Sequence, residues 1–371
     1  MLGGLAAAVA IIFFVTAHEA GHFLAAKAVG MKVTQFFFGF GPKIWSTQKG
    51  ETEYGFKWFP LGGYVRIIGM NPMEEVAPED MGRTYREKKF WEKSLVVLAG
   101  VGTNFLLAFL IFYGLTLAQG VATPQPEIAQ VVATVEVDGV ESPSPAAMAG
   151  LRSGDVIVAV NGVEVSTWED ITGALKGAGA GAAPIVIDRN GSILELEAVL
   201  IEQQAADGSG TTGYLGIGPE IAIEDVGVIE GIGIAGQTIW DAIKLTFESL
   251  GQLVRPSNLL QYLGVFVGNT DVEPEIRPVS PIGIVNLGTQ AQSAGSFLAV
   301  LALVNVALAS INLLPLFPLD GGHFAVALYE KVTKREANVQ RLMPIAVAVI
   351  GLFLFLGFVG IVLDIVNPIA L

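Results

Sequence analysis

The chain has 371 residues, of which 52% are hydrophobic and only 15% charged, and its formal net charge is −14. About a quarter of the residues of a typical soluble domain are charged, so the composition disfavours a soluble protein. The acidic balance disfavours a nucleic-acid partner. Cysteine is absent, which excludes disulfides and thiolate metal sites. A transition metal would need carboxylates and the three histidines, His18, His22 and His323.

Four segments are long and apolar enough to cross a hydrocarbon core of about 30 Å, which takes about 20 residues. They cover about residues 3–29, 94–118, 297–319 and 344–366. The first lacks a basic n-region and a clear cleavage site, so we predict a retained helix rather than a signal peptide. The chain is therefore expected to be a multi-pass protein surrounded by lipid.

The distribution of charge predicts an orientation. Residues 27–93 carry 11 Lys and Arg, whereas residues 120–296 carry 6 against 22 Asp and Glu. Because basic connections stay in the cytoplasm, we expect residues 27–93 and 320–343 on that side. Four spans then place the acidic stretch and both termini outside the inner (plasma) membrane.

The first span contains the pattern His18-Glu19-Ala20-Gly21-His22. On a helix, positions i and i+4 share a face, so both imidazoles can bind one zinc ion while Glu19 takes a proton from a water at the metal. Ionisable residues in an apolar span are costly and are functional candidates for that reason. The pattern predicts a catalytic zinc centre; the alternative is a structural polar cluster between helices.

Residues 32–68 are aromatic and glycine-rich, with the alternation and turn signals of strands and hairpins. Their apolar character directly after the first span favours a segment that re-enters the membrane, where protein or a watery cavity must satisfy its backbone. The alternative is a soluble cytoplasmic hairpin.

The acidic stretch begins with a different composition. Residues 144–171 predict a short helix, a buried strand "VIVAV", an Asn-Gly turn and a second helix, and residues 184–200 predict a terminal hairpin with its own Asn-Gly turn. Residues 232–255 have apolar side chains at helical spacing. That helix could lie on the outer membrane surface or pack on the neighbouring globular domain.

The third span ends in "INLLPLFPLDGGHF", residues 311–324, where two prolines break the helix. Catalytic zinc usually takes three protein ligands. His18 lies about 22 Å into the first span, at 1.5 Å per residue, and is therefore past the midplane. Asp320 lies at the far end of a span that runs in the same direction. We expect Asp320 as the third ligand, with His323 as the alternative.

These motifs resemble the site-2 protease family, in particular its bacterial RseP-like members. The resemblance covers nearly the whole chain and rests on five motifs in order: "HEAGHF" at 18–23, "FFFGFGPKIW" at 36–45, "FPLGGYVRIIGM" at 59–70, "AGVGTNF" at 99–105 and "NLLPLFPLDGG" at 312–322. There is room for one PDZ domain where RseP has two. The chain is therefore similar to the shorter single-PDZ members.

The resemblance implies a polytopic α-helical membrane protein with about four transmembrane helices, a membrane re-entrant β segment and an inserted extracytoplasmic α+β PDZ domain. Residues 1–123 would form the N-terminal membrane part and residues 124–220 the PDZ domain. Residues 221–296 would form an amphipathic linker region, and residues 297–371 the C-terminal membrane part with the Asp-Gly motif.

The resemblance also assigns roles. His18, His22 and Asp320 would bind Zn²⁺, and Glu19 would act as general base in the cytoplasmic half of the bilayer. The residues expected to bind substrate are Gly62, Gly63, Tyr64, Val65, Asn104, Asn312 and Pro315. The β segment would pair with an unwound substrate stretch by strand addition; the alternative is that it plugs the active site. The alternative for Asn312 is a helix-packing amide.

"GYLGIGP" at 213–219 looks like the carboxylate-binding loop of a PDZ domain, which would make Tyr214, Leu215, Gly216 and Ile217 part of a peptide groove. It could equally be a plain strand after the domain. The PDZ domain could bind peptides, including a trimmed substrate C-terminus, or exclude substrates that keep large outer domains.

The implied activity is that of a metalloendopeptidase in regulated intramembrane proteolysis. It would hydrolyse a peptide bond in the transmembrane segment of single-pass proteins that another protease has trimmed outside. Anti-sigma factors and signal peptide remnants are the expected substrates. A non-catalytic PDZ adaptor is the alternative, but it would predict an eroded HExxH motif or a missing aspartate, and both are intact here. A metal or proton transporter would predict polar residues along a path across the membrane, whereas here they gather at one depth.

Overall fold

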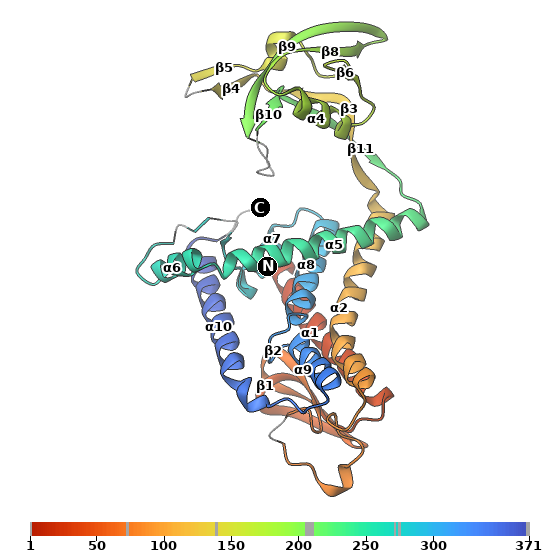
Figure 1. Cartoon of the computed structure of the whole chain (residues 1–371), viewed down its shortest axis with the longest axis vertical. Helices are drawn as coiled ribbons and strands as arrows, with labels where there is room; N and C mark the ends of the chain where they lie inside the picture. Colours follow the sequence, from red (N-terminus) through yellow and green to blue (C-terminus); the bar gives the residue numbers. More distant parts are fainter. Residues whose placement is uncertain are drawn as a thin grey trace. The chain divides into compact units, whose positions relative to one another are not determined.

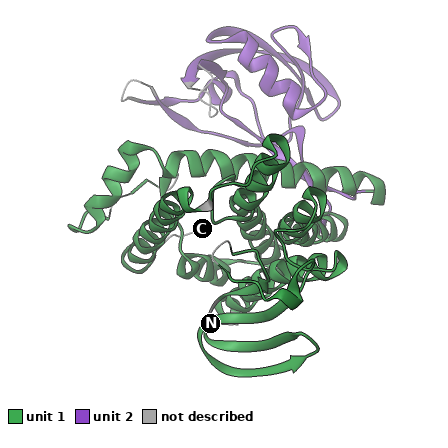
Figure 2. Ribbon diagram, turned by 60° about the horizontal axis from the view of Figure 1, so that its bottom comes forward, with its two compact units in different colours: residues 1–118, 227–371 green, residues 119–226 purple. Residues whose placement is uncertain are grey.

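The structure is a computed structural model that describes residues 2–71, 74–137, 140–204, 211–270, 272–273 and 276–368. The chain divides into two compact units (Figure 2). Met1–Ala118 and Gly227–Leu371 form the first, here called the membrane unit, and Gln119–Val226 form the second, here called the sheet unit.

In the described part of the chain, four helices are long and apolar enough to cross a membrane. They are α1 (Leu2–Ala28), α2 (Phe90–Gln119), α8 (Ala294–Asn312) and α10 (Met343–Val366). The four predicted spans are thus confirmed as helices. The third ends at Asn312 rather than near residue 319, because Pro315 and Pro318 follow and a helix cannot hold a proline in its interior.

Further helices complete the membrane unit. α5 (Val228–Leu253), the predicted amphipathic helix, lies across the ends of α8 and α10 in Figure 1. It packs on α2 and α8 through Ala235 and Ala242. The sequence patterns did not predict α6 (Pro256–Val265), α7 (Pro281–Gln290) or α9 (Asp320–Thr333). α7 packs against the first turns of α1, where a Cβ on Gly3 would lie 2.7 Å from the Gly288 carbonyl oxygen.

The strands predicted after the first span are β1 (Val33–Lys49) and β2 (Thr52–Ile67), which fold back on each other. The first half of β1 is paired on both sides, so that Phe36 faces Val65 on one side and Tyr54 on the other. The second half of β1 pairs with the first half of β2, as in the pair Trp45 and Phe56. Residues 63–67 therefore form one edge of a small antiparallel sheet.

The sheet unit contains a sheet with the strand order β10-β9-β8-β6-β3-β11, and β7 pairs with β6. Two helices, α3 and α4, and a separate β4–β5 hairpin accompany it. The elements are β3 (Val121–Val131), β4 (Thr134–Val137), β5 (Val140–Pro143), α3 (Pro145–Ala149), β6 (Val156–Val160), β7 (Val163–Glu164), α4 (Trp168–Ala178), β8 (Gly181–Arg189), β9 (Ser192–Gln204), β10 (Thr211–Tyr214) and β11 (Ile217–Glu224).

Local signals position these elements as the sequence predicts. Ser144 accepts a hydrogen bond as the N-cap of α3, and Thr167 and Asp170 form a capping box at the start of α4. Asn161 and Asn190 have φ values of 49° and 54°, as two-residue hairpin turns require. Both Asn-Gly turns, the buried strand and both helices are thereby confirmed.

The core of the sheet unit is an apolar cluster between the sheet and its helices. Its largest fully buried members are Ile128, Ile157, Ile171, Ile185, Ile187 and Leu215. Burial of each such side chain contributes roughly 1.5–3 kcal/mol of transfer free energy. The sheet unit thus has a core of its own, separate from that of the membrane unit.

Candidate active site

Two nitrogen atoms and one oxygen atom converge where the C-terminal half of α1 packs on the N-terminal half of α2. His18 Nε2 lies 3.1 Å from His22 Nε2, and Asp320 Oδ2 lies 3.1 Å from the first and 3.2 Å from the second. These residues are the group of His, Asp and Glu side chains in the described part of the chain that could hold a metal ion. Both imidazoles are buried. The i, i+4 spacing of the two histidines on α1 and the start of α9 bring the three together.

The hydrogen bonding of His22 fixes what its Nε2 presents. His22 Nδ1 lies 2.8 Å from the Val96 carbonyl oxygen on α2. A carbonyl oxygen only accepts, so Nδ1 carries the hydrogen and Nε2 of the neutral ring presents a lone pair. That lone pair faces a second imidazole and a carboxylate oxygen. Asp320 Oδ2 is buried and has no hydrogen-bond donor among the residues that the structure describes.

This donor set fits zinc. Ligands about 2.0 Å from a tetrahedral ion lie roughly 3.3 Å apart, close to the edges of the triangle formed by the three atoms. Two imidazoles and one carboxylate are a known catalytic zinc set that leaves one position open. A cation would satisfy the otherwise unpaired Asp320 oxygen and relieve the repulsion between lone pairs.

Close helix packing makes room for the site. A Cβ on Gly100 of α2 would lie 2.3 Å from His22 Nε2, and a Cβ on Gly21 of α1 would lie 2.6 Å from the Ala99 carbonyl oxygen. Glycine at these two positions lets the helices approach until the imidazole lies against the α2 backbone. The Gly100 of the "AGVGTNF" motif thus has a steric reason.

A sharp turn after α8 positions the carboxylate. Asp320 is the first residue of α9, and a Cβ on Gly321 would lie 2.2 Å from the Leu313 carbonyl oxygen. The glycine therefore allows α9 to start directly against the end of α8. His323 belongs to a different environment, because its ring packs edge-on against Phe317 with the centroids 4.8 Å apart.

Glu19 lies between the metal ligands and the sheet edge. The backbone amide of Val65 donates toward its carboxylate. A Cβ on Gly63 would lie 3.3 Å from Glu19 Cγ and 3.1 Å from the Phe37 carbonyl oxygen. The strand 63–67 can approach the glutamate this closely because Gly63 has no side chain. A carboxylate, a candidate metal centre and a strand edge are thus adjacent.

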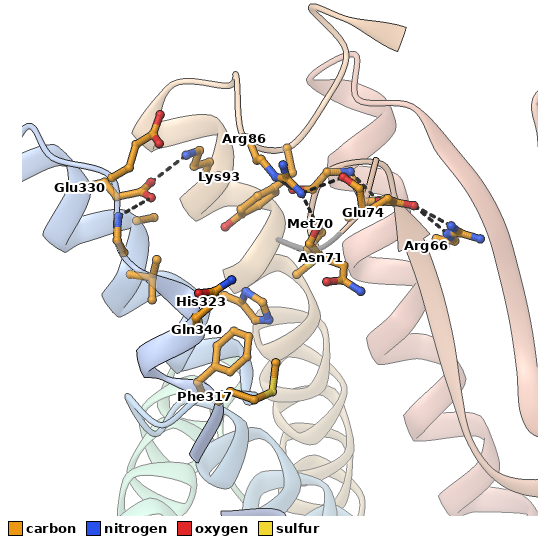
Figure 3. Close-up of a pocket in the computed structure, with 18 of the residues that line it drawn as sticks. Arg66, Met70, Asn71, Glu74, Arg86, Lys93, Phe317, His323, Glu330 and Gln340 are labelled. Carbon is orange, nitrogen blue, oxygen red and sulfur yellow. Dashed lines mark hydrogen bonds and ion pairs between the residues drawn. The ribbon is translucent and has the colours of Figure 1, made fainter. Parts of the chain in front are cut away.

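A cavity of about 1300 Å³ adjoins this edge and is lined by β2, the segment after it and α9 (Figure 3). Tyr64 and Val65 line one wall, and His323 and Phe317 another. Lys93 of α2 and Glu330 of α9 both line it and form an ion pair of 3.0 Å. The cavity is large enough for several residues of an extended peptide.

Tyr85 also lines this cavity and is a residue that the sequence patterns did not single out. Its ring is buried beside the α1–α2 contact, and its hydroxyl has no partner in the described part of the chain. Burial, together with the nearby Glu330 and Asp320 carboxylates, raises its pKa, so the hydroxyl keeps its proton.

The other predicted substrate-binding residues lie in three places. Asn312 is half-buried at the last residue of α8, and Pro315 is exposed in the turn that follows. Gly62 precedes the edge strand with a φ of +114°. Asn104 is fully buried, and its carbonyl oxygen accepts a hydrogen bond of 2.7 Å from Asn305 Nδ2 on α8. Neither Asn104 nor Asn312 is among the residues that line the cavity.

The four predicted groove residues form the connection between β10 and β11. Tyr214 ends β10 and Ile217 begins β11. The Leu215 side chain is in the core, and its carbonyl oxygen accepts from the Ala146 amide. Gly216 has a φ of +88°. The segment is thus a turn that leads into the edge strand β11.

The sequence patterns did not single out two residues, Val96 and Asn305, that make hydrogen bonds to residues in and near the site. Val96 acts through its backbone carbonyl, which no side-chain pattern reveals. Asn305 is a buried amide in an apolar span, and that feature alone marks it as a candidate.

Comparison with known proteins agrees with this geometry. The model of peptidase family M50 matches residues 6–358. The chain belongs to that family. It is 33% identical to the zinc metalloprotease Rip1 of Mycobacterium tuberculosis over 98% of this chain and 97% of the relative. It is 32% identical to Rip1 of Mycolicibacterium smegmatis over the same shares. Membership in family M50 makes the chain a membrane-bound metalloprotease with zinc as its cofactor.

Proposed function

We propose that this M50 protease hydrolyses a peptide bond within the transmembrane segment of single-pass membrane proteins that have first been trimmed outside. The observation that carries the proposal is the convergence of His18 and His22 of α1 with Asp320 of α9, beside the Glu19 carboxylate. Anti-sigma factors and signal peptide remnants are the substrates we expect.

His18, His22 and Asp320 would hold the zinc ion, which when bound polarises a water and the scissile carbonyl. Glu19 would accept a proton from the attacking water and pass it to the departing amide nitrogen. Asn312, at the end of α8, would hold the substrate backbone near the carboxylate. The half-buried surroundings would exclude competing water.

A helical peptide bond is protected by its own hydrogen bonds, so the substrate must unwind before it is cut. The edge strand 63–67 supports a route for this step. An extended substrate added to that edge would exchange helical hydrogen bonds for strand hydrogen bonds. Tyr64 and Val65 would pair with it, and Gly62 and Gly63 would let its backbone pass Glu19.

The β1–β2 sheet would contact lipid or substrate rather than water. Its far half exposes large aromatic side chains, among them Trp45, Trp58 and Phe59. Aromatic side chains of this kind are enriched at membrane interfaces. Their exposure supports a segment that re-enters the membrane, with the active site in its cytoplasmic half.

The sheet unit would act outside the membrane as a PDZ domain. The turn at 214–217 leads into an edge strand, as peptide capture by strand addition requires. The acidic stretch that contains it supports an extracytoplasmic place. It would either bind a trimmed C-terminus or exclude bulky outer domains.

Cleavage of a model single-pass substrate by the purified protein in detergent tests the proposal. Wild type should cut, a zinc chelator should abolish cutting, and Glu19→Gln should retain zinc but lose roughly 10²- to 10⁴-fold in rate. A Glu19→Gln variant that cuts like wild type would contradict the role of Glu19. Zinc-free wild-type protein would favour a non-catalytic PDZ adaptor instead.

A further inference from the structure

Several buried polar side-chain atoms on α1, α2 and α8 have no hydrogen-bond partner in the described part of the chain. In the described part of the chain, four of them are His18 Nδ1, Asn104 Nδ2, Asn104 Oδ1 and Asn305 Oδ1. Asn104 and Asn305 are both fully buried in apolar helices. Unpaired polar atoms are rare inside proteins because burial removes their hydrogen bonds to water and nothing replaces them. Two donors and two acceptors in one helix cluster call for an explanation.

The packing of α1 on α2 sets the level of these residues. Ala25 and Ala26 pack with Val96 and Val97, whereas Phe14 packs with Leu107 further along α2. The helices are therefore antiparallel, and one turn back on α1 corresponds to one turn forward on α2.

His22 lies against Val96 and Gly100 of α2. His18 is one turn before His22, and Asn104 is one turn after Gly100. Residues four apart lie on the same face of a helix. By this helix spacing, His18 and Asn104 lie at the same level of the α1–α2 contact.

The helix α8 brings Asn305 to that level. Phe14 of α1 and Leu301 of α8 share one apolar cluster, and one turn further on each helix are His18 and Asn305. The amide of Asn305 is bonded to the Asn104 carbonyl oxygen. Three helices thus bring an imidazole and two amides together at one depth.

We infer that Asn104 is the positioning residue of His18. In the zinc-loaded enzyme His18 Nδ1–H donates to Asn104 Oδ1, and Asn104 Nδ2–H donates to Asn305 Oδ1. This series of two hydrogen bonds satisfies all four atoms, because each donor is matched to one acceptor. It does for His18 what the Val96 carbonyl does for His22: it holds the hydrogen on Nδ1 and aims Nε2 at the metal.

This role differs from the substrate contact that the sequence motif predicts for Asn104. It also explains why an amide, rather than an apolar residue, stands one turn from Gly100 in a membrane span. Because the inference rests on the metal role of His18 proposed above, its test must separate the two.

The test compares zinc retention by full-length wild type, Asn104→Leu, Asn104→Asp and Ser310→Ala in detergent against a chelator series. Leucine has the same number of side-chain heavy atoms and the same branching as asparagine but accepts no hydrogen bond, so zinc affinity should fall roughly 10- to 100-fold. Aspartate keeps the acceptor oxygen for His18 Nδ1 but loses the donor to Asn305, so it should retain zinc better than leucine and less well than wild type. Ser310 is another buried unpaired residue on α8, and Ser310→Ala should match wild type.

A second measurement is specific to His18. The chain has three histidines, so ¹⁵N-histidine labelling gives three imidazoles to resolve. In zinc-loaded Asn104→Leu, the Nδ1 resonance of His18 should shift and that of His22 should not. An unshifted His18 resonance in Asn104→Leu would overturn the inference. So would a zinc affinity of Asn104→Leu within twofold of wild type, or an equal loss of zinc affinity in Ser310→Ala. Wild type that binds no zinc would instead overturn the proposed function itself.

Discussion

Two carboxylates, that of the buried Asp155 in the sheet unit and that of the half-buried Asp320 in the membrane unit, have opposite surroundings. Asp155 is 1% exposed and accepts from Arg189 at 2.6 and 2.8 Å and from the Arg152 amide at 2.8 Å. Asp320 faces two imidazole nitrogens, and its Oδ2 has no donor. The protein alone satisfies the first carboxylate, whereas the second needs a cation.

The same difference extends over both units. In the part of the chain that the structure describes, every buried side-chain nitrogen or oxygen without a partner lies in the membrane unit. The sheet unit places its polar groups in caps, turns and ion pairs around an apolar core. The membrane unit places them inside, where they are costly unless they bind something. Buried polar atoms without partners thus distinguish the interior of the membrane unit, which contains the candidate site, from the interior of the sheet unit.

The largest expected effect is the difference in zinc affinity between a variant without the Asp320 carboxylate and one without the Asp155 carboxylate. Asp320→Ala removes one of three ligands, and zinc affinity should fall by more than the roughly 100-fold that loss of an outer partner can cause. Asp155→Ala should leave zinc content and cleavage at the wild-type level. Zinc analysis of both purified variants checks this. An Asp320→Ala protein that retains stoichiometric zinc would remove the aspartate from the metal site.

Adding one methyl group should sharpen the comparison within a single helix. Gly100→Ala would put a Cβ 2.3 Å from His22 Nε2, so the imidazole must move away from the metal. We expect zinc affinity and cleavage to fall by roughly 10- to 100-fold. Gly102→Ala is the matched control, since a Cβ there meets nothing within 4 Å. Equal effects of the two changes would mean that the loss comes from helix stability alone.

The fold was predictable from the sequence where local chemistry decides it. Apolar length predicted the four spans, and the Asn-Gly turns with the apolar strand between them predicted the middle of the sheet unit. α7 was not predicted, because it is short, lacks an amphipathic pattern and is held by contacts with α1 such as that at Gly3.

The site divides in the same way. The i, i+4 spacing placed His18 and His22 on one helix face, and the pattern after the third span singled out Asp320. The Val96 carbonyl, the orphaned Tyr85 hydroxyl and the level shared by Asn104 and Asn305 depend on how helices distant in sequence pack. No single segment contains that information.

Breaking the satisfied carboxylate should affect stability rather than zinc. Asp155→Asn removes the negative charge of an ion pair whose carboxylate is buried and whose guanidinium is partly exposed, so the sheet unit should lose stability. Hydrogen exchange of the Ile157 and Ile185 amides in the full-length protein measures this. Exchange that matches wild type would show that the pair contributes nothing.

The pH dependence of that exchange gives a further check. The hydrogen bond from Arg189 holds the pKa of Asp155 below its usual value. Its stabilising contribution is therefore fully present above the unfolded pKa of about 3.9 and is lost as the pH falls through the lower folded-state pKa. In wild type, protection should fall below about pH 4, and in Asp155→Asn this part of the dependence should be absent.

The smallest expected effect tests whether the sheet unit is as locally determined as its sequence suggests. Thr167 accepts a hydrogen bond from the Asp170 amide, and the Asp170 side chain accepts from the Thr167 amide in return. Thr167→Ala removes half of this box and should cost about 1 kcal/mol. Thr172→Ala, on the exposed middle of the same helix, should be neutral or slightly stabilising because alanine is the better helix former. Exchange of the α4 amides distinguishes the two, and equal protection would mean that packing of Ile171 and Leu175 on the core, rather than the cap, fixes where α4 begins.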